Sequence, residues 1–393
     1  MSRPAYANHT ERARAAARLL DFVPGPALGA AAAILSRRPA AGGETIALIR
    51  CDHLGDYLMT TPAIRALRAA RPAPRIEMLV SPAAAPALAR NPDVTERAIL
   101  DAPWYEPFSG READPAGILA SMFWLRGRRA AAVVEMRGDP RLLALAAFSG
   151  APRRLGWSNL GLGRVLTEGR ALDPAMPHGE RAFSLLAALG AVKPAGEAGV
   201  RPVFRIEDAD RREAGHLLGP HTRRPLVVIA PASNRPAHTW GASRFAAAAG
   251  ILAAGGARIA VTGRGHEAGE TAVTAAGAGA AALDLGGRTS LGSLAAILER
   301  ADLLLANDSG TVHLAAAARC PSVALFGPTS PRLSFPYEGL RGSRALAGAT
   351  PCARPCFDAD CREDHGYGAL TPESVAAACL GTLESNRAGA GSP

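Results

Sequence analysis

One junction between a predicted strand and a predicted helix carries residue types that suit an anion. Residues 302–306 read as a buried strand, and Asn-Asp-Ser-Gly at 307–310 leads into a helix expected over 312–318. A glycine lets the backbone approach a ligand closely, and a helix N-terminus offers free N–H groups and a positive dipole end. His313 in the first helical turn adds a donor. The segment therefore suits a diphosphate, with a plain helix cap as the alternative.

A second junction gathers groups that could move a proton. A strand expected over 46–49 ends in Arg-Cys-Asp-His-Leu-Gly-Asp at 50–56, and a helix is expected over 58–70. Two carboxylates and a histidine crowd this turn, and Asp56 is our candidate for a general base acting on a hydroxyl. Helix capping is the competing interpretation, because an aspartate at a helix N-terminus is stabilising in any case.

Two further junctions carry polar groups after buried strands. The segment 230–240 holds small hydroxyl residues, an arginine and a histidine, which together suit a phosphate. The segment 261–267 holds glycines and an acid, which suit a nucleotide and its ribose hydroxyls. Each of the two signals is weak when it is taken alone.

The elements that must position these residues alternate between strand and helix in two series. The expected strands are 46–49, 76–80 and 131–135 in the first series, and 226–230, 258–262, 302–306 and 322–326 in the second. Continuous apolar strands separated by helices are typical of parallel sheets covered on both faces. We therefore expect an α/β protein with two Rossmann-like domains facing a central cleft, with ligands at the carboxyl ends of the strands. The expected divisions are an N-terminal helical appendage at 1–43, domains at 44–205 and 206–371, and a C-terminal helix and tail at 372–393.

Composition narrows the class of protein. The chain has 393 residues and a formal charge of +9, and Lys193 is its one lysine. The arginines are scattered and aromatics make up 5% of the residues, which argues against nucleic-acid binding. A basic surface of this kind fits an anionic donor or anionic lipid better.

The N-terminal region and the cysteines bear on the compartment. Six cysteines are too few for a disulfide scaffold of this size. The apolar stretch 19–35 is interrupted by Pro24 and Pro26 and is short for a membrane span. It reads either as an interfacial helix on lipid or as a helix packed on the domain surface, and we favour the second. We expect a cytoplasmic enzyme, with the inner face of the plasma membrane as its place of contact.

Taken in order, the junctions resemble glycosyltransferase family 9, the bacterial ADP-heptose:lipopolysaccharide heptosyltransferases. The matching stretches are IALIRCDHLGDYLMTTPAIRALR (46–68), VVEMRGDPRLLALAAFSGAPRRLGW (133–157), VVIAPASNRPAHTWGASRFA (227–246) and LGGRTSLGSLAAILERADLLLANDSGTVHLAAAARCPSVALFGPTSP (285–331). The resemblance implies a GT-B architecture, with 44–205 on the acceptor side and 206–371 binding the nucleotide-sugar donor.

The resemblance also implies an inverting transfer that needs no metal and no cofactor, because the ADP-sugar is a substrate. Asp56 would be the catalytic base, and a lipopolysaccharide core or another cell-surface glycan would be the acceptor. The donor-binding residues that it implies, at the diphosphate, the adenine and the ribose, are Ser233, Asn234, Glu267, Thr289, Asp308, Ser309, Gly310 and His313. Arg137 and Arg141 are candidates for an acidic acceptor, with ordinary surface or capping roles as the alternative.

One position departs from the family pattern. The family usually has a lysine two residues before the tryptophan of the third stretch, and this chain has His238 before Trp240. Lys193 lies near the junction of the two expected domains, far from this stretch, and is no substitute. We therefore expect His238 to contact the diphosphate, with Arg235 and Arg264 as other sources of positive charge.

A cluster of metal-ligand types follows the last matching stretch: Cys352, Cys356, Cys361 and His365. The spacings are not those of a standard zinc ribbon or finger. Reduced thiols in a loop are the interpretation that we favour, with a structural metal as the alternative.

Three rival functions remain. A nucleotide-sugar epimerase of the same fold would need extra acids near the anomeric centre, and it would work on the donor alone. An NAD-dependent dehydrogenase would need a Gly-x-Gly-x-x-Gly after the first strand, which is missing. A catalytically silent binding module with this fold is kept open by the histidine at 238.

Overall fold

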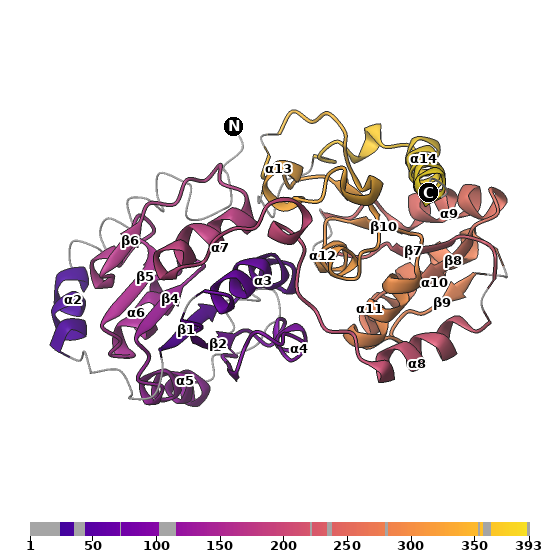
Figure 1. Ribbon diagram of the computed structural model, residues 1–393. Helices are drawn as coiled ribbons and strands as arrows, with labels where there is room; N and C mark the ends of the chain where they lie inside the picture. The colour runs from indigo at the N-terminus through magenta and orange to yellow at the C-terminus, as the bar shows by residue number, and fades with distance from the viewer. Residues whose placement is uncertain are drawn as a thin grey trace. The chain divides into compact units, whose positions relative to one another are not determined.

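The structure is a computed structural model, and it divides into two compact units, one ending at Val203 and the other beginning at Phe204 (Figure 1). The boundary expected from the sequence was after residue 205. The residues that the structure describes are 24–34, 44–70, 72–101, 115–220, 222–233, 238–279, 282–352, 354–356 and 363–390.

The first unit is built on a six-stranded sheet in the order β3-β2-β1-β4-β5-β6, in which every pair of neighbours is parallel. Its strands are β1 (Thr45–Arg50), β2 (Arg75–Val80), β3 (Glu96–Ile99), β4 (Ala132–Glu135), β5 (Arg153–Trp157) and β6 (Glu168–Arg170). Its helices are α2 (Pro24–Ile34), α3 (Leu54–Arg68), α4 (Ala85–Leu88), α5 (Pro115–Gly127), α6 (Pro140–Phe148) and α7 (His178–Leu186), with short 3₁₀ turns η3 (Gly163–Val165), η4 (Ala187–Leu189) and η5 (Gly196–Gly199).

The second unit repeats this order, as β12-β11-β10-β7-β8-β9. Its strands are β7 (Leu226–Ala230), β8 (Arg258–Val261), β9 (Leu283–Asp284), β10 (Leu303–Asn307), β11 (Ser322–Phe326) and β12 (Arg344–Ala347). Its helices are α8 (Asp208–Leu218), α9 (Ala242–Ala254), α10 (Ala268–Gly277), α11 (Leu291–Arg300), α12 (Gly310–Ala317), α13 (Pro331–Ser334) and α14 (Pro372–Ala390), with 3₁₀ turns η7 (Gly265–Glu267), η8 (Leu340–Gly342) and η9 (Tyr367–Ala369).

In each sheet the order in which successive strands are added reverses at one place, and this place decides where ligands can bind. In the first unit the reversal lies between β1 and β4, where Ile49 is opposite Glu135. In the second it lies between β7 and β10, where Ala230 is opposite Ala306. The loops on the carboxyl side of such a switch point leave in opposite directions and open a crevice. The structure thus places the predicted junctions after β1 and β10 beside the two switch points.

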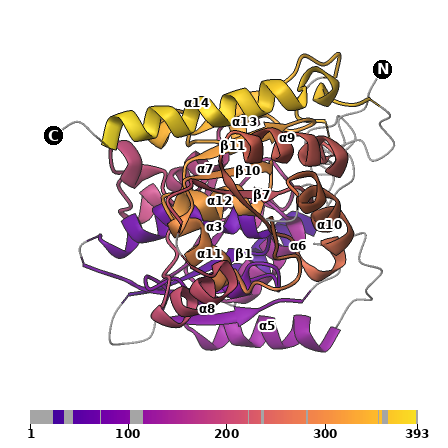
Figure 2. The ribbon, with the colours of Figure 1, turned by 90° about the vertical axis from the view of Figure 1, so that its right-hand side faces the viewer.

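The central strands form because their side chains are buried on both faces. Strands β7, β10 and β11 are buried along their whole length. Helix α14 closes the second unit by packing Val375, Cys379 and Leu383 into the core beside Phe245 of α9, and Figure 2 shows it running along that side. Each fully buried aliphatic side chain contributes roughly 1.5–3 kcal/mol.

Helix α2 is the described part of the predicted appendage. It packs on the first unit, where Ala32 is buried against Leu143 and Ala147 of α6 and Val165 of η3. This agrees with the interpretation of a helix packed on the domain surface. Residues 1–23 and 35–43 lie outside the described residues.

The α/β fold class predicted from the sequence is confirmed. Each unit has the strand order of a Rossmann domain, and two such units in one chain are what a GT-B fold requires. Among the described residues, no helix combines the length and the apolar character needed to span a bilayer.

Candidate active site

The candidate base lies where β1 passes into α3. The helix begins at Leu54 with His53 as its N-cap residue, so Asp56 occupies the first turn. The sequence prediction began this helix at residue 58, which was four residues late. A carboxylate in the first helical turn is stabilised by the free N–H groups and the dipole of the helix.

Arg50 is the hub of a charged cluster around Asp56. Its Nε lies 3.2 Å from Asp52 Oδ2, and its Nη2 lies 3.6 Å from Asp56 Oδ1. Its Nη1 donates a 2.8 Å hydrogen bond to the carbonyl oxygen of Met136. His178, the first residue of α7, places its Nδ1 3.9 Å from Asp56 Oδ1. The guanidinium thereby ties the ends of β1 and β4 together beside the carboxylate.

These charges give the two aspartates different acidities. Burial raises the pKa of Asp56, but Arg50, His178 and His53 together lower it by more, so this pKa lies below its ordinary value. For Asp52 burial prevails over Arg50 and Arg137, and its pKa is raised. Of the two carboxylates, Asp56 is therefore the one whose surroundings favour the ionised form, which is the form that a general base needs.

Glu135, at the end of β4, holds the turn that carries Arg137 of the same cluster. Its two carboxylate oxygens accept hydrogen bonds from the backbone N–H groups of Arg137, at 3.0 Å, and Gly138, at 2.6 Å. Burial raises its pKa to about 8, against the opposing effect of these two donors. Glu135 thus shapes the turn that presents the side chain of Arg137.

The two predicted acceptor-side arginines have different surroundings. Arg137 donates to Asp52 Oδ1 at 2.6 Å and to the carbonyl oxygen of Cys51 at 2.9 Å, so it belongs to the cluster around Asp56. Arg141 is bidentate on Asp139, the N-cap residue of α6, at 2.9 and 2.6 Å. Arg137 is the better placed of the two to act with Asp56.

In the second unit, a buried asparagine joins the loops at the switch point. Asn307 ends β10 and is fully buried. Its Nδ2 donates to the carbonyl oxygen of Pro231 at 2.6 Å, and its Oδ1 accepts from the backbone N–H of Trp240 at 3.0 Å. The segments after β7 and β10, both predicted to bind phosphate, are therefore fastened to each other.

Three buried hydroxyl groups sit at the carboxyl ends of strands in this sheet. Ser309 precedes α12, Thr262 follows β8 and Thr329 follows β11. Within the described part of the chain, none of the three hydroxyl oxygens has a hydrogen-bond partner. Ser309 is the N-cap residue of α12, yet its side chain accepts no capping bond. A buried hydroxyl without a partner costs about 1–3 kcal/mol, which a ligand at this edge would recover.

His313 is placed deeper than the sequence suggested. It is 3% exposed, and its Nδ1 lies 3.0 Å from the hydroxyl oxygen of Tyr337. Gly310 is the first residue of α12, and the N–H of Asp308 continues the sheet by donating to Leu325. Contact between these residues and a diphosphate stays a prediction.

The segment after β7 is described in part. Ser233 and His238 are half-buried, and Asn234 and Arg235 lie outside the described residues. The hydrogen bond from the backbone N–H of Trp240 to the side chain of Asn307 holds the end of this segment, and His238 with it, beside β10. His238, which stands where the family usually has a lysine, therefore lies at the predicted phosphate site.

The predicted ribose acid has partners of its own. Glu267 accepts from the backbone N–H of Arg264 at 2.7 Å and from its guanidinium at 3.2 and 3.0 Å. A ribose hydroxyl would have to share or replace one of these bonds. Thr289 is half-buried just before α11, on a loop held by a 2.8 Å bond from Gly287 to Gly263.

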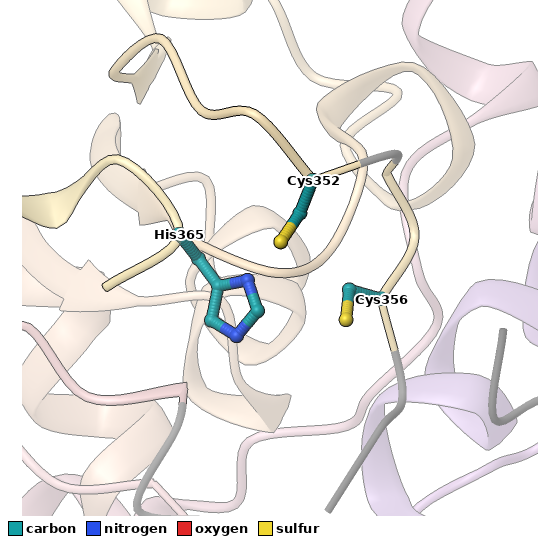
Figure 3. A group of neighbouring side chains, drawn as sticks. All are labelled: Cys352, Cys356 and His365. Atoms are coloured by element: carbon teal, nitrogen blue, oxygen red, sulfur yellow. The ribbon is translucent and has the colours of Figure 1, made fainter. Parts of the chain in front are cut away.

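The cysteine cluster forms in space as well as in sequence. Ligand atoms of Cys352, Cys356 and His365 all lie within 4.8 Å of one another (Figure 3). Cys361 lies outside the described residues.

Sequence reasoning missed four residues of these two sites. Arg50 and His178 act on Asp56 through space, and Glu135 acts through the backbone of the next turn. Thr329 carried a usable signal, because it follows a predicted strand in the manner of Ser309. Arg50 and His178 carried no such signal, because their roles depend on contacts between elements that are distant in sequence.

Two Rossmann units, one with a buried carboxylate at its switch point and the other with a helix start suited to an anion, are the arrangement expected of a nucleotide-dependent group transferase. The sequence profile of glycosyltransferase family 9 (heptosyltransferase) matches residues 123–366, which is more than half of the chain. The protein belongs to this family, and it is an enzyme that transfers sugar.

Individual relatives agree with this assignment. Lipopolysaccharide heptosyltransferase 2 of Escherichia coli (strain K12) is 26% identical over 306 residues, covering 75% of this chain and 85% of that protein. The structure of E. coli ADP-heptose lps heptosyltransferase II has a TM-score of 0.68 at 23% identity, covering 87% of this chain and 99% of that one. The family 9 glycosyl transferase from Veillonella parvula DSM 2008 reaches 0.72 at 22% identity, covering 89% and 99%. At these identities the structural likeness concerns the fold alone.

Proposed function

We propose that this enzyme transfers heptose from ADP-heptose to a hydroxyl group of a lipopolysaccharide-core glycan. The donor and the acceptor are those named for its relatives. The observation that carries the proposal is the position of Asp56 beside Arg50 and His178, which favour its ionised form, at a switch point of a family 9 sugar transferase.

The proposed reaction is a single displacement. Asp56 takes the proton of the acceptor hydroxyl, and the acceptor oxygen attacks the anomeric carbon as the bond to ADP breaks. Attack from the face opposite the leaving group inverts the configuration. Arg50 and Arg137 would favour the ionised base and position an acidic acceptor.

The departing diphosphate gains negative charge, and residues of the second unit would stabilise it. The N-terminus of α12 supplies N–H groups and the positive end of its dipole. Ser309 and Thr329 supply hydroxyl groups with no partner in the described chain. These groups, with His238 in place of the family lysine, provide for transfer without a metal ion.

The net positive charge of the chain supports a place of action at the inner face of the plasma membrane. The charge of +9 would attract anionic lipid, where a glycolipid acceptor resides. Co-sedimentation with anionic vesicles but not with neutral ones tests this part of the proposal. Equal recovery with both kinds of vesicle would refute it.

The central experiment is a transfer assay with ADP-heptose and a core glycolipid. We expect mass spectrometry to show one added heptose per acceptor, NMR to show an inverted anomeric centre, and added Mg²⁺ or Mn²⁺ to leave the rate unchanged. Conversion of ADP-heptose without acceptor would favour an epimerase. Binding of donor with no conversion of either kind would favour a silent module.

Two variants locate the chemistry. Asp56→Asn should lower kcat by about 10²–10⁴-fold with donor affinity kept, because the base is lost. The exposed Asp208→Asn serves as the control. His238→Ala should weaken donor binding, and unchanged donor affinity and turnover in this variant would refute the phosphate contact.

A further inference from the structure

We propose that Cys352, Cys356 and His365 bind a zinc ion that fastens the chain around them to the end of β11. The two cysteines follow β12, and the histidine precedes η9. The reaction proposed above does not use this ion. Its function here is structural, and it lies outside the carboxylate cluster of the first unit.

The positions of the three side chains carry the proposal. One ligand atom from each lies within 4.8 Å of the other two. Bonds of about 2.0–2.3 Å in a tetrahedral zinc site set ligand atoms roughly 3.3–3.8 Å apart, so adjustments of about 1 Å suffice. Figure 3 shows the two thiols and the imidazole ring arranged around a shared space.

The histidine supplies a second, independent observation. His365 is 2% exposed, and its Nδ1 has no hydrogen-bond partner among the residues that the structure describes. A buried polar atom left in this state costs about 1–3 kcal/mol. A metal ion would use the lone pair of that imidazole and remove the cost.

Surrounding bonds hold the backbone of the ligands in place. Arg354 lies between the two cysteines and donates to three carbonyl oxygens, those of Gly327 at 2.6 Å, Gly348 at 2.7 Å and His365 at 2.8 Å. The N–H of Cys356 donates to the carbonyl oxygen of Pro328 at 2.7 Å. Three segments thus converge before any metal arrives, as preorganised sites require.

The ligand types select the ion. Thiolates and imidazole suit zinc or iron, whereas Mg²⁺ and Ca²⁺ prefer oxygen ligands. Zn²⁺ with two thiolates and one neutral imidazole is electrically balanced, which favours a site this well buried. Binding releases the two thiol protons to solvent.

The site adjoins the predicted donor groups through Tyr367. Its ring packs on Gly327 so closely that an added Cβ there would lie 2.3 Å from Tyr367 Cε2. Asp308 lies near enough to Tyr367 for the charge of its carboxylate to act on the tyrosine hydroxyl. The zinc would therefore hold Tyr367 and Gly327 in place beside the predicted donor site, an effect that rests on the proposed function.

Metal analysis tests the site directly. The full-length protein, purified with a reductant and without chelator, should contain roughly one zinc per chain by plasma mass spectrometry. Cys352→Ser, Cys356→Ser and His365→Ala should each lose most of it. Cys320→Ser, which alters a buried thiol elsewhere in the same unit, should retain it.

Cobalt gives a readout that does not depend on activity. Protein loaded with Co²⁺ should show tetrahedral visible bands and thiolate-to-cobalt charge transfer in the near ultraviolet. His365→Cys should keep the metal and strengthen the charge transfer, even if His365→Ala folds poorly. Loss of zinc should weaken donor binding severalfold. Unchanged donor affinity in the zinc-free protein would refute the link to the donor site but not the zinc site itself.

Four results would contradict the proposal. The first is protein that holds no zinc as purified and takes up none from added Zn²⁺. The second is equal zinc loss in Cys320→Ser and Cys352→Ser, and the third is iron at full occupancy, which would refute zinc as the ion. A disulfide between Cys352 and Cys356 in freshly purified, metal-free protein would also count against it.

Discussion

The side chain of Asn307 accepts a 3.0 Å hydrogen bond from the backbone N–H of Trp240, across 67 residues of sequence. Its amide nitrogen donates at the same time to Pro231, at 2.6 Å. The asparagine is fully buried, so water replaces neither bond. One side chain therefore sets the spacing between the two loops that are proposed to hold the donor diphosphate.

Asn307→Ala should destabilise the protein and weaken donor binding together. It leaves a buried N–H and a buried carbonyl group without partners, at a cost of about 1–3 kcal/mol for each. Denaturant unfolding and donor titration measure the two effects. The control is Asn159→Ala, whose amide makes two comparable bonds to Leu172 in the first unit. That variant should lose stability with donor affinity unchanged, and equal donor effects would contradict the role of Asn307.

The acid limb of the pH–rate profile should report the neighbours of Asp56. Its pKa is lower in the folded chain, so the carboxylate stabilises the fold above the ordinary pKa of an aspartate. This contribution is lost as the pH falls through the folded pKa. Arg50→Gln should move the acid limb of kcat to higher pH, and His178→Gln should move it less, because Arg50 is the larger of the two attractions.

A pH profile of kcat across the acid range, with circular dichroism to confirm folding, measures both shifts. Glu168→Gln, which changes a carboxylate of the distant strand β6, should leave the limb in place. A larger shift from His178→Gln than from Arg50→Gln would contradict the arrangement of charges described for this cluster.

Glu135 should make the protein less stable as the pH rises. Burial raises its pKa from 4.5 to about 8, so the folded chain binds a proton that the unfolded chain has released. The stabilisation is complete below the unfolded pKa and is lost as the pH rises through the folded pKa, with a slope of at most about 1.4 kcal/mol per pH unit.

Urea unfolding between pH 5 and 9 would measure the slope, because this interval covers most of the range between the two pKa values and extends about one unit above the folded one. Glu135→Gln should flatten it and also lower stability by about 1–3 kcal/mol, because one of the two backbone donors loses its acceptor. A slope that persists in the variant would show that another group is responsible.

The sequence predicted the central strands well and the edge strands poorly. The ranges 226–230 and 322–326 match β7 and β11 to the residue, since both strands are continuous apolar runs buried on two faces. The strands β3, β6, β9 and β12 lie at the sheet edges and were all missed. These edge strands are short and partly exposed, so tertiary pairing rather than an apolar pattern determines them. The interior strand β5 was missed as well, because its sequence RRLGW begins with two arginines and is not an apolar run.

The residues of the candidate sites also differ in how far the sequence predicts them. The positions of Asp56 and Ser309 just after strand ends could be predicted from chain order alone, and parallel sheets gather their ligands there. The contact of Arg50 with Asp56, the burial of His313 and the pairing of Glu267 with Arg264 depend on side-chain packing, which no local pattern reports.

Removing the hydroxyl groups of Ser309 and Thr329 should separate donor binding from stability. Neither hydroxyl has a partner in the part of the chain that the structure describes, so Ser309→Ala and Thr329→Val should leave the free energy of unfolding unchanged or raise it. Each should nevertheless weaken donor binding by about 1 kcal/mol, roughly fivefold to tenfold, because a phosphate oxygen loses a donor. Isothermal titration calorimetry with the donor measures the donor affinity, and urea unfolding without the donor measures the free energy of unfolding.

The matched control is Thr61→Val in the first unit, because Thr61 accepts a 2.7 Å bond from the N–H of Val203 and donates to Leu58 at 2.6 Å. Its loss should lower stability by about 1–3 kcal/mol and leave donor affinity alone. If Ser309→Ala instead behaved like Thr61→Val, with lost stability and intact affinity, its hydroxyl would be a structural group. The diphosphate would then have to be held by the N–H groups of α12 and by His238.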